Sequence, residues 1–166
     1  MPPVPGLRDN SEIAHKYLRG EIEFGEKVVV IGGGLVGSET ALALARKGTD
    51  VTVLEMLPDI VMQDEPLSQI AIRGELASAH AKIICGAKVT EIRRDGVEYE
   101  KDGKRECAAA DTVIAALGLK ARRSVVESLV NVCPDTRVIG DAVRGRKLYA
   151  CMHEAWDAVR EISGVF

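Results

Sequence analysis

The chain has 166 residues, of which 46% are hydrophobic, 28% charged and 4% aromatic, and its formal net charge is −3. This composition excludes a disordered chain, a collagen-like chain and a small disulfide scaffold, and the acidic balance argues against a protein that mainly holds nucleic acid phosphates. No apolar run reaches the roughly 18 residues of a membrane span and no secretory signal precedes the chain, so we expect a soluble, cytoplasmic protein without a membrane partner.

The first 22 residues are predicted to form a lead-in segment, because three prolines and Gly6 disfavour regular structure there. A short helix is predicted within this segment over Glu12–Leu18, and Gly20 is expected to end it.

A strand, a helix and a second strand are predicted next. Lys27–Gly32 is a run of β-branched residues without alternation, which is typical of a strand buried on both faces of a parallel sheet. Leu35–Lys47 has helical spacing, and Asp50–Glu55 is a second short strand. The three segments together have the size of one βαβ unit.

The middle of the chain changes from helical to strand patterns. A helix is predicted from Glu65 or Pro66 to His80, followed by a short strand over Lys82–Cys85. Three further strands are then expected, separated by the two Asp-Gly pairs that signal tight hairpins: Lys88–Arg94, Gly96–Lys101 and Lys104–Ala108. They predict an antiparallel β-meander in place of a crossover helix.

The last segments are a buried strand over Asp111–Ala116, a possible short helix within Lys120–Asp135, a strand over Arg137–Gly140 and a helix over Leu148–Ile162. The final helix carries an apolar stripe for which the chain supplies no obvious sheet. We therefore expect this tail either to fold back on the rest of the chain or to bury its stripe in a neighbouring copy, giving a homodimer.

A glycine-rich motif joins the first strand to its helix. Residues 32–37, GGGLVG, satisfy the pattern G-x-G-x-x-G after a buried strand and at the start of a helix, where the pattern is informative. Gly32 permits the tight turn, Gly34 lets the backbone approach a diphosphate, and Gly37 lets the helix pack closely on the strand. The candidate cofactor-binding residues of this motif are Gly32, Gly33, Gly34, Leu35, Val36 and Gly37.

Glu55 supplies the second half of this signal. It ends the second strand about 20 residues after the motif, where an acidic side chain accepts hydrogen bonds from an adenosine ribose. A carboxylate suits a free 2′-hydroxyl and repels a 2′-phosphate, so the sequence predicts NAD(H) as the cofactor, preferred over NADP(H) by tenfold or more.

The other chemistry-bearing residues show no catalytic pattern. None of the four cysteines lies close enough in sequence to another to form a redox pair or a metal-binding run, and the three histidines are scattered. We therefore predict no catalytic residue and no metal ligand in this chain, and any electron chemistry would come from a bound cofactor.

With these residues in place, the chain resembles the pyridine-nucleotide (NADH) domain of the two-dinucleotide-binding-domain flavoproteins. The stretches KVVVIGGGLVGSETALALARKG, DVTVLEMLP, DTVIAALGLKAR and TRVIGDAVRGRKLYACMHEAWDAVREI follow that family's order. The last two are most similar to the C-terminal part of old yellow enzyme-class NADH:flavin oxidoreductases, of the 2-enoate and 2,4-dienoyl-CoA reductase type. In those enzymes a flavin-bearing (β/α)8 barrel with an iron–sulfur cluster precedes an FAD domain that contains the NAD(P)H domain.

The resemblance implies roles for three further residues. Glu39 would lie near the nicotinamide end of NADH, Gly118 would line the nicotinamide ribose, and Asp141 would bind FAD. The first FAD fingerprint, the barrel and the cluster cysteines are missing from the chain. The resemblance therefore implies that FAD, FMN and the iron–sulfur cluster belong only to the full-length parent, whose remaining FAD domain and flavin barrel would be the partners.

The sequence thus predicts an α/β fold, a Rossmann-like three-layer NAD(P)-binding domain with an antiparallel β-meander insert and trailing FAD-domain segments. The expected boundaries are 1–22 for the lead-in from the FAD domain, 23–118 for the NADH-binding domain and 119–166 for the C-terminal part of the FAD domain. The expected function is to deliver hydride from NADH to FAD, and the isolated chain is expected to bind NADH with little turnover. Two alternatives stay open, an FAD-binding domain in its own right and a non-catalytic NADH-sensing module.

Overall fold

The computed structural model describes residues 3–62, 64–130, 132–133 and 135–163, so Pro2 of the predicted lead-in lies outside the described residues. The chain divides into two compact units, Met1–Leu117 and Gly118–Phe166, which are described separately below. Within the described residues, none of the helices has both the length and the apolar character needed to cross a membrane.

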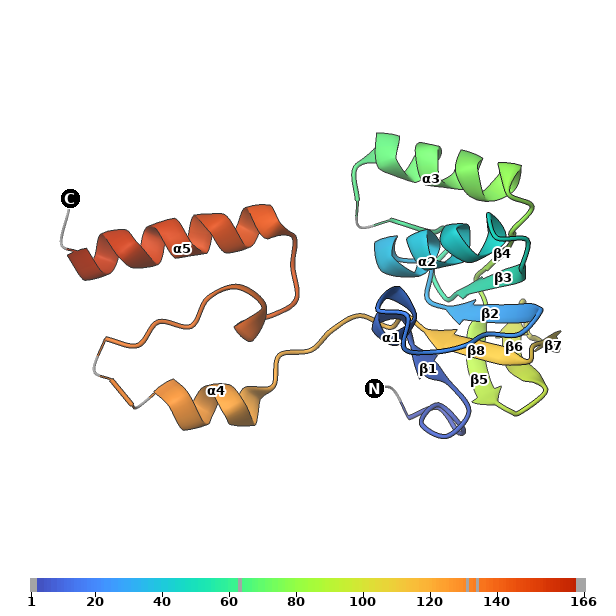
Figure 1. Ribbon diagram of the computed structural model, residues 1–166, viewed down its shortest axis with the longest axis horizontal. Helices are drawn as coiled ribbons and strands as arrows, with labels where there is room; N and C mark the ends of the chain where they lie inside the picture. Colours follow the sequence, from blue (N-terminus) through green and yellow to red (C-terminus); the bar gives the residue numbers. More distant parts are fainter. Residues whose placement is uncertain (1–2, 63, 131, 134, 164–166) are drawn as a thin grey trace. The chain divides into compact units, whose positions relative to one another are not determined.

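The first unit is built on a parallel sheet of five strands in the order β1-β8-β2-β3-β4 (Figure 1). The strands are β1 (Glu12–Ile13), β2 (Lys27–Ile31), β3 (Asp50–Glu55), β4 (Lys82–Cys85) and β8 (Thr112–Ala115). Because β2 pairs with both β3 and β8, it lies at the centre of the sheet. Its carboxyl end therefore opens between the ends of two neighbouring strands, which is where parallel α/β sheets bind ligands.

Successive residues of β2 point into two different cores. Val28 and Val30 belong to a core that includes Leu44 and Leu76 from the helices, whereas Val29 and Ile31 belong to a core with Ile92, Val97 and Tyr99. Such two-sided burial explains the unbroken run of β-branched residues. The helices on the first face are α1 (Ala14–Leu18), α2 (Leu35–Ala45) and α3 (Pro66–Ser78).

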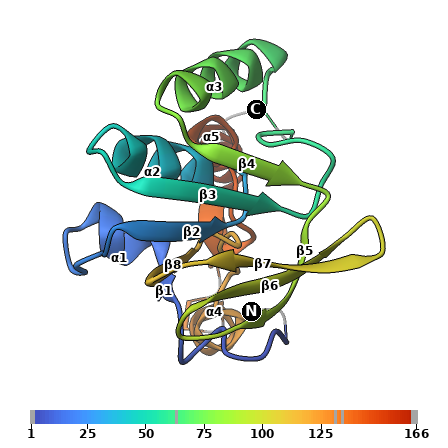
Figure 2. The same cartoon turned by 90° about the vertical axis from the view of Figure 1, so that its right-hand side faces the viewer.

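The second face of the parallel sheet is covered by a β-meander, as Figure 2 shows. Its strands are β5 (Lys88–Ile92), β6 (Gly96–Lys101) and β7 (Lys104–Ala109), and they form an antiparallel sheet. Asp102 and Gly103 connect β6 to β7 with φ angles of 51° and 73°, the left-handed conformation that two-residue hairpins of type I′ require. The three layers and the hairpins of the sequence prediction are confirmed.

Tyr99 gives the meander a testable dependence on pH. Its ring is 3% exposed and its hydroxyl donates to Glu106 Oε2 at 2.7 Å, and burial followed by this hydrogen bond raises the pKa of Tyr99 to about 12. Since the unfolded phenol has a pKa of about 10, its stabilising contribution is complete below pH ~10 and is lost as the pH rises towards 12. We expect the free energy of unfolding in urea to fall more steeply over this interval for the parent than for Tyr99→Phe.

The matched control for this prediction is Tyr149→Phe, because Tyr149 is 73% exposed. This variant should keep the alkaline slope of the parent. Equal slopes for the parent and Tyr99→Phe would contradict the assignment.

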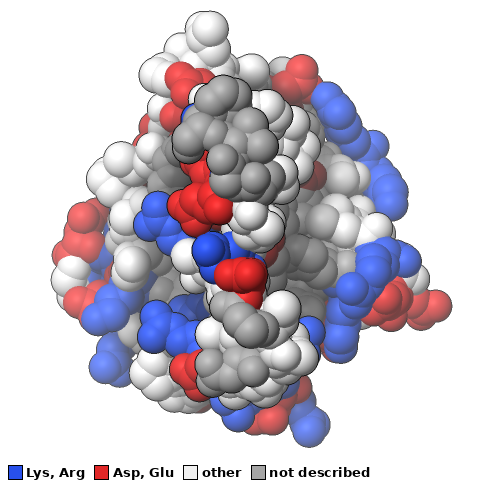
Figure 3. Space-filling view, turned by 90° about the vertical axis from the view of Figure 1, so that its left-hand side faces the viewer, with Lys and Arg blue, Asp and Glu red and all other residues white. Residues whose placement is uncertain are grey.

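The second unit contains two helices and a single 3-10 turn among its described residues. These elements are α4 (Arg123–Val130), η1 (Gly140–Ala142) and α5 (Leu148–Ser163). The Gly140 N–H donates to Glu154 Oε2 at 2.8 Å, which ties η1 to α5. Four apolar residues of α5 are more than 60% exposed: Leu148, Met152, Trp156 and Val159. Acidic and basic side chains lie side by side on the face of the chain shown in Figure 3.

Two predicted elements are wrong. The helix expected over Glu12–Leu18 begins only at Ala14, because Glu12 and Ile13 pair in parallel with Ile114 and Ala115 at the edge of β8. The strand expected over Arg137–Gly140 does not form among the described residues. Gly140 has a φ angle of 63° and starts a 3-10 turn, so an extended segment cannot run through it.

Several other element ends differ from the prediction by one or two residues. The helix predicted over Leu35–Lys47 ends at Ala45, the helix predicted to His80 ends at Ser78, and the strand predicted over Lys88–Arg94 ends at Ile92. Such differences are normal, because helix and strand ends fray.

Candidate functional site

Gly32 and Gly37 are glycines for reasons internal to the fold. Gly32 follows β2 with a φ angle of 100°, and a Cβ placed there would lie 2.6 Å from the carbonyl oxygen of Ala116. A Cβ on Gly37 would overlap the carbonyl oxygen of Gly32 and lie 3.1 Å from the Cβ of Ala116. These two glycines let α2 begin directly against the ends of β2 and β8.

Gly33 is enclosed between two other segments. A Cβ on Gly33 would lie 2.6 Å from Cγ2 of Ile60 and 3.1 Å from the Cβ of Glu55. Its N–H donates to Glu55 Oε2, and its carbonyl oxygen accepts hydrogen bonds from the Val61 N–H at 2.8 Å and the Ser38 hydroxyl at 3.0 Å. Gly33 is therefore held through both its N–H and its carbonyl oxygen.

Gly34 differs from its neighbours because a Cβ there would meet no atom within 4 Å. Its φ of −65° and ψ of 179° are open to any residue, and no side chain caps the helix that begins after it. The first N–H groups of α2, starting with Leu35 and Val36, have no acceptor within their own helix and carry the positive end of its dipole. Nothing in the described fold requires glycine here, whereas a diphosphate approaching these N–H groups does.

Glu55 lies directly beside this turn. It is the last residue of β3, and its side chain is buried with 9% of its surface exposed. One carboxylate oxygen accepts from the Gly33 N–H and the other from the Leu57 N–H at 2.8 Å. Because each carboxylate oxygen has two lone pairs, both keep capacity for a further donor such as a ribose hydroxyl.

Three predicted residues remain, Glu39, Gly118 and Asp141. Glu39 lies on α2 with an exposed side chain. Gly118 and Asp141 belong to the second unit. Gly118 has a φ angle of 78° and open space around it, and the exposed Asp141 accepts from the Arg146 N–H at 3.2 Å.

Two residues of the turn were missed by reasoning from the sequence. Ser38 is fully buried and its hydroxyl reaches back to Gly33, which the motif pattern could have indicated from its place one residue after Gly37. Val61 contacts Gly33 from a different loop, and no local signal marks it. Among the described residues, no group of three or more His, Cys, Asp or Glu could hold a metal ion, and the four cysteines are free.

The chain is similar to several known proteins. A family model described as pyridine nucleotide-disulphide oxidoreductase matches residues 1–142. The chain is 37% identical over 153 residues to an NADH oxidase of Thermoanaerobacter brockii, a match that covers 90% of this chain and 24% of the relative. It is 28% identical over 141 residues to a cinnamate reductase of Clostridium sporogenes, covering 83% of this chain and 21% of the relative.

The chain is also similar to solved structures. A structure of 2-naphthoyl-CoA reductase in complex with 2-naphthoyl-CoA matches with a TM-score of 0.88 and 29% identity, covering 95% of this chain and 24% of that one. The chain therefore spans about a quarter of the length of the relatives it resembles.

Proposed function

The chain belongs to the pyridine nucleotide-disulphide oxidoreductase family, and on this premise we propose that it is the NADH-binding module of a flavin-dependent oxidoreductase. In the full-length enzyme it holds NADH so that hydride passes from the nicotinamide to FAD, which is the chemistry that the bound nucleotide supplies.

The observation that carries this proposal is the open space at Gly34. Four glycines share the motif, but only at Gly34 would an added Cβ meet no atom within 4 Å. It stands at the start of α2, where unpaired N–H groups favour an anion. The residues present therefore fit a diphosphate, with Gly32–Gly37 holding it.

The role of Glu55 is to bind the adenosine ribose. Its carboxylate is already oriented by two backbone N–H groups and faces the same turn. It accepts hydrogen bonds from the 2′- and 3′-hydroxyls and disfavours a 2′-phosphate by charge repulsion, so the module selects NADH. By resemblance, Glu39 and Gly118 are assigned to the nicotinamide end and Asp141 to FAD.

The full-length enzyme is proposed to be of the old yellow enzyme class. The names of two relatives, cinnamate reductase and 2-naphthoyl-CoA reductase, support a reductase of an unsaturated acid or acyl-CoA. In such an enzyme FMN and an iron–sulfur cluster belong to the barrel, and the exposed stripe of α5 packs against the rest of the FAD domain. The alternative partner of this stripe is a second copy of the chain, in a homodimer.

The test is to titrate the full chain with NADH, NADPH and FAD in parallel and to measure the binding of each by calorimetry. We expect NADH to bind, NADPH to bind at least about tenfold more weakly, and FAD to bind more weakly than NADH. Tighter binding of FAD would favour the FAD-binding alternative, and binding of none of the three would contradict the proposal.

Glu55→Gln is expected to lower NADH affinity by about tenfold and to reduce the NADH:NADPH affinity ratio by more than that. An amide keeps the shape of the side chain, but its NH2 group replaces one of the two oxygens that accept from Gly33 and Leu57. It also loses the charged hydrogen bonds to the ribose hydroxyls and the repulsion of a 2′-phosphate. The measurement is the dissociation constant of each nucleotide by calorimetry.

The matched control is Asp50→Asn, which neutralises the exposed carboxylate at the opposite end of the same strand. It should leave the NADH:NADPH ratio of the parent unchanged. An unchanged ratio in Glu55→Gln as well would contradict the assignment of Glu55.

A further inference from the structure

The segment Leu57–Val61, between β3 and α3, contacts the glycine turn on one side and α3 on the other. Ile60 and Val61 are 0% and 2% exposed. The Val61 N–H donates to the Gly33 carbonyl oxygen at 2.8 Å, and Ile60 Cγ2 lies 2.6 Å from the position that a Cβ on Gly33 would take. This segment therefore holds Gly33, the residue whose N–H donates to the Glu55 carboxylate.

The backbone of Val61 is held in a sparsely populated conformation. Its φ angle is 54°, in the left-handed region that a β-branched residue rarely enters. The other described non-glycine residues with positive φ are His80, just after α3, and Asp102, in a hairpin turn, where such angles are common. A strained residue persists only where its surroundings over-determine it, and such residues cluster at ligand sites.

The surroundings that hold this segment include two side chains of α3. Gln69 Nε2 donates to the carbonyl oxygen of Ile60 at 2.8 Å. Arg73, one helical turn further, donates from Nε to Asp59 Oδ1 at 2.8 Å and pairs with the same oxygen through Nη2 at 2.6 Å. Residues four apart lie on one face of a helix, so the two side chains reach adjacent residues of the segment, Gln69 binding Ile60 and Arg73 binding Asp59. The Arg73 guanidinium also lowers the pKa of Asp59.

We propose that Gln69 and Arg73 are positioning residues of the dinucleotide site, which fix Asp59–Val61 and thereby set the orientation of Gly33 and of Glu55. They touch no nucleotide themselves. Glu55 discriminates between the ribose of NADH and the 2′-phosphorylated ribose of NADPH, whereas both nucleotides share the diphosphate contacts. The orientation of Glu55 therefore affects the binding of NADH more than the binding of NADPH. The inference rests on the proposed NADH-binding function.

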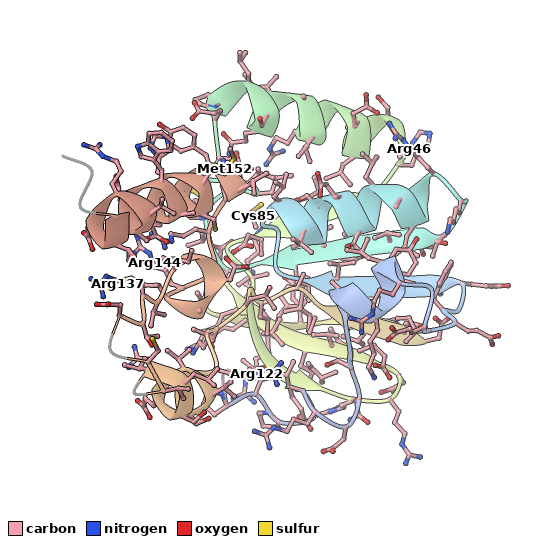
Figure 4. All side chains as sticks on the ribbon, turned by 60° about the vertical axis from the view of Figure 1, so that its left-hand side comes forward. Arg46, Cys85, Arg122, Arg137, Arg144 and Met152 are labelled. Atoms are coloured by element: carbon pink, nitrogen blue, oxygen red, sulfur yellow. The ribbon has the colours of Figure 1, made fainter. Side chains whose placement is uncertain are left out.

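A second contact of α3 provides the matched control. Arg46 follows the last residue of α2, at the end of the helix away from the glycine turn, and forms an ion pair with Glu75 of α3. Figure 4 shows Arg46 at the far end of α2 from Cys85, which ends β4 and pairs in register with Glu55. Arg46→Gln thus removes a contact of the same helix at the end away from the site.

The experiment measures the dissociation constants of NADH and NADPH for the parent chain and four variants, with the thermal midpoint of each. We expect Gln69→Leu to weaken NADH binding about fivefold and to lower the NADH:NADPH ratio, and the double variant Gln69→Leu/Arg73→Leu to weaken it about tenfold. Gln69→Lys keeps a donor and should restore most of the loss, and Arg46→Gln should keep the ratio of the parent.

The NADH:NADPH affinity ratio separates a loss of positioning from a loss of stability, because partial unfolding reduces the affinity for both nucleotides by the same factor. Equal losses for NADH and NADPH in Gln69→Leu, or parental affinities for both, would overturn the positioning role. A parent chain that binds no NADH would instead overturn the proposed function itself.

Discussion

Gly34→Val is expected to abolish measurable NADH binding, weakening it by at least about 100-fold, while the chain stays folded. The Cβ of the valine meets no atom within 4 Å, so the substitution is expected to leave the fold intact. The valine side chain fills the space through which a diphosphate approaches the first N–H groups of α2. The free energy of unfolding should fall by no more than about 1 kcal/mol, the difference between glycine and a poor helix cap. Calorimetry with NADH and urea unfolding measure the two effects.

Gly74→Val is the matched control for this prediction. Gly74 lies on α3, and a Cβ there also meets nothing within 4 Å. The same substitution at this equally open position should leave NADH affinity unchanged. Parental affinity in Gly34→Val would show that the diphosphate binds elsewhere.

Gly37→Ala, in contrast to Gly34→Val, is expected to destabilise the fold. The added Cβ overlaps the backbone carbonyl oxygen of Gly32 and crowds the Cβ of Ala116, and neither atom can move away without a shift of the backbone that carries it. Overpacking of this kind costs about 3 kcal/mol. Urea unfolding followed by far-ultraviolet circular dichroism should show a lower midpoint with an unchanged slope.

The reference variant for Gly37→Ala is Gly34→Ala, which adds the same methyl group three residues earlier without a clash. Its midpoint should stay close to that of the parent. A parental midpoint in Gly37→Ala would mean that α2 and β2 are packed less closely than the structure shows.

Gly34 and Gly37 also show what the sequence could and could not predict about the site. The motif pattern identifies Gly32, Gly34 and Gly37 together, from spacing alone. Only the structure separates the glycines needed by the fold from Gly34, because the separation depends on which distant atoms, such as those of Ala116, surround each one. The position of Glu55 was predictable, since the end of a buried strand can be read from a local apolar run.

The distinction between local and distant signals also explains which of the other elements and residues were predicted and which were missed. The strands Asp50–Glu55, Lys82–Cys85 and Gly96–Lys101 were predicted to the residue, because apolar runs and Asp-Gly turns are local features. Glu12–Ile13 was mistaken for helix because its partner, β8, lies far along the chain. Val61 was missed for the same reason, since its importance comes from a hydrogen bond to Gly33 in another loop.

The position of β8 has a consequence for biosynthesis. Val28 pairs with Thr112 and Ile31 with Ala115, so the central strand gains its second neighbour only from the far end of the unit. The meander strands β5–β7 pair between adjacent segments and can assemble as soon as they leave the ribosome. The parallel sheet, by contrast, keeps an open edge on β2 until Ala115 has been translated, and during that interval a nascent chain exposes its most apolar strand to chaperones and to aggregation.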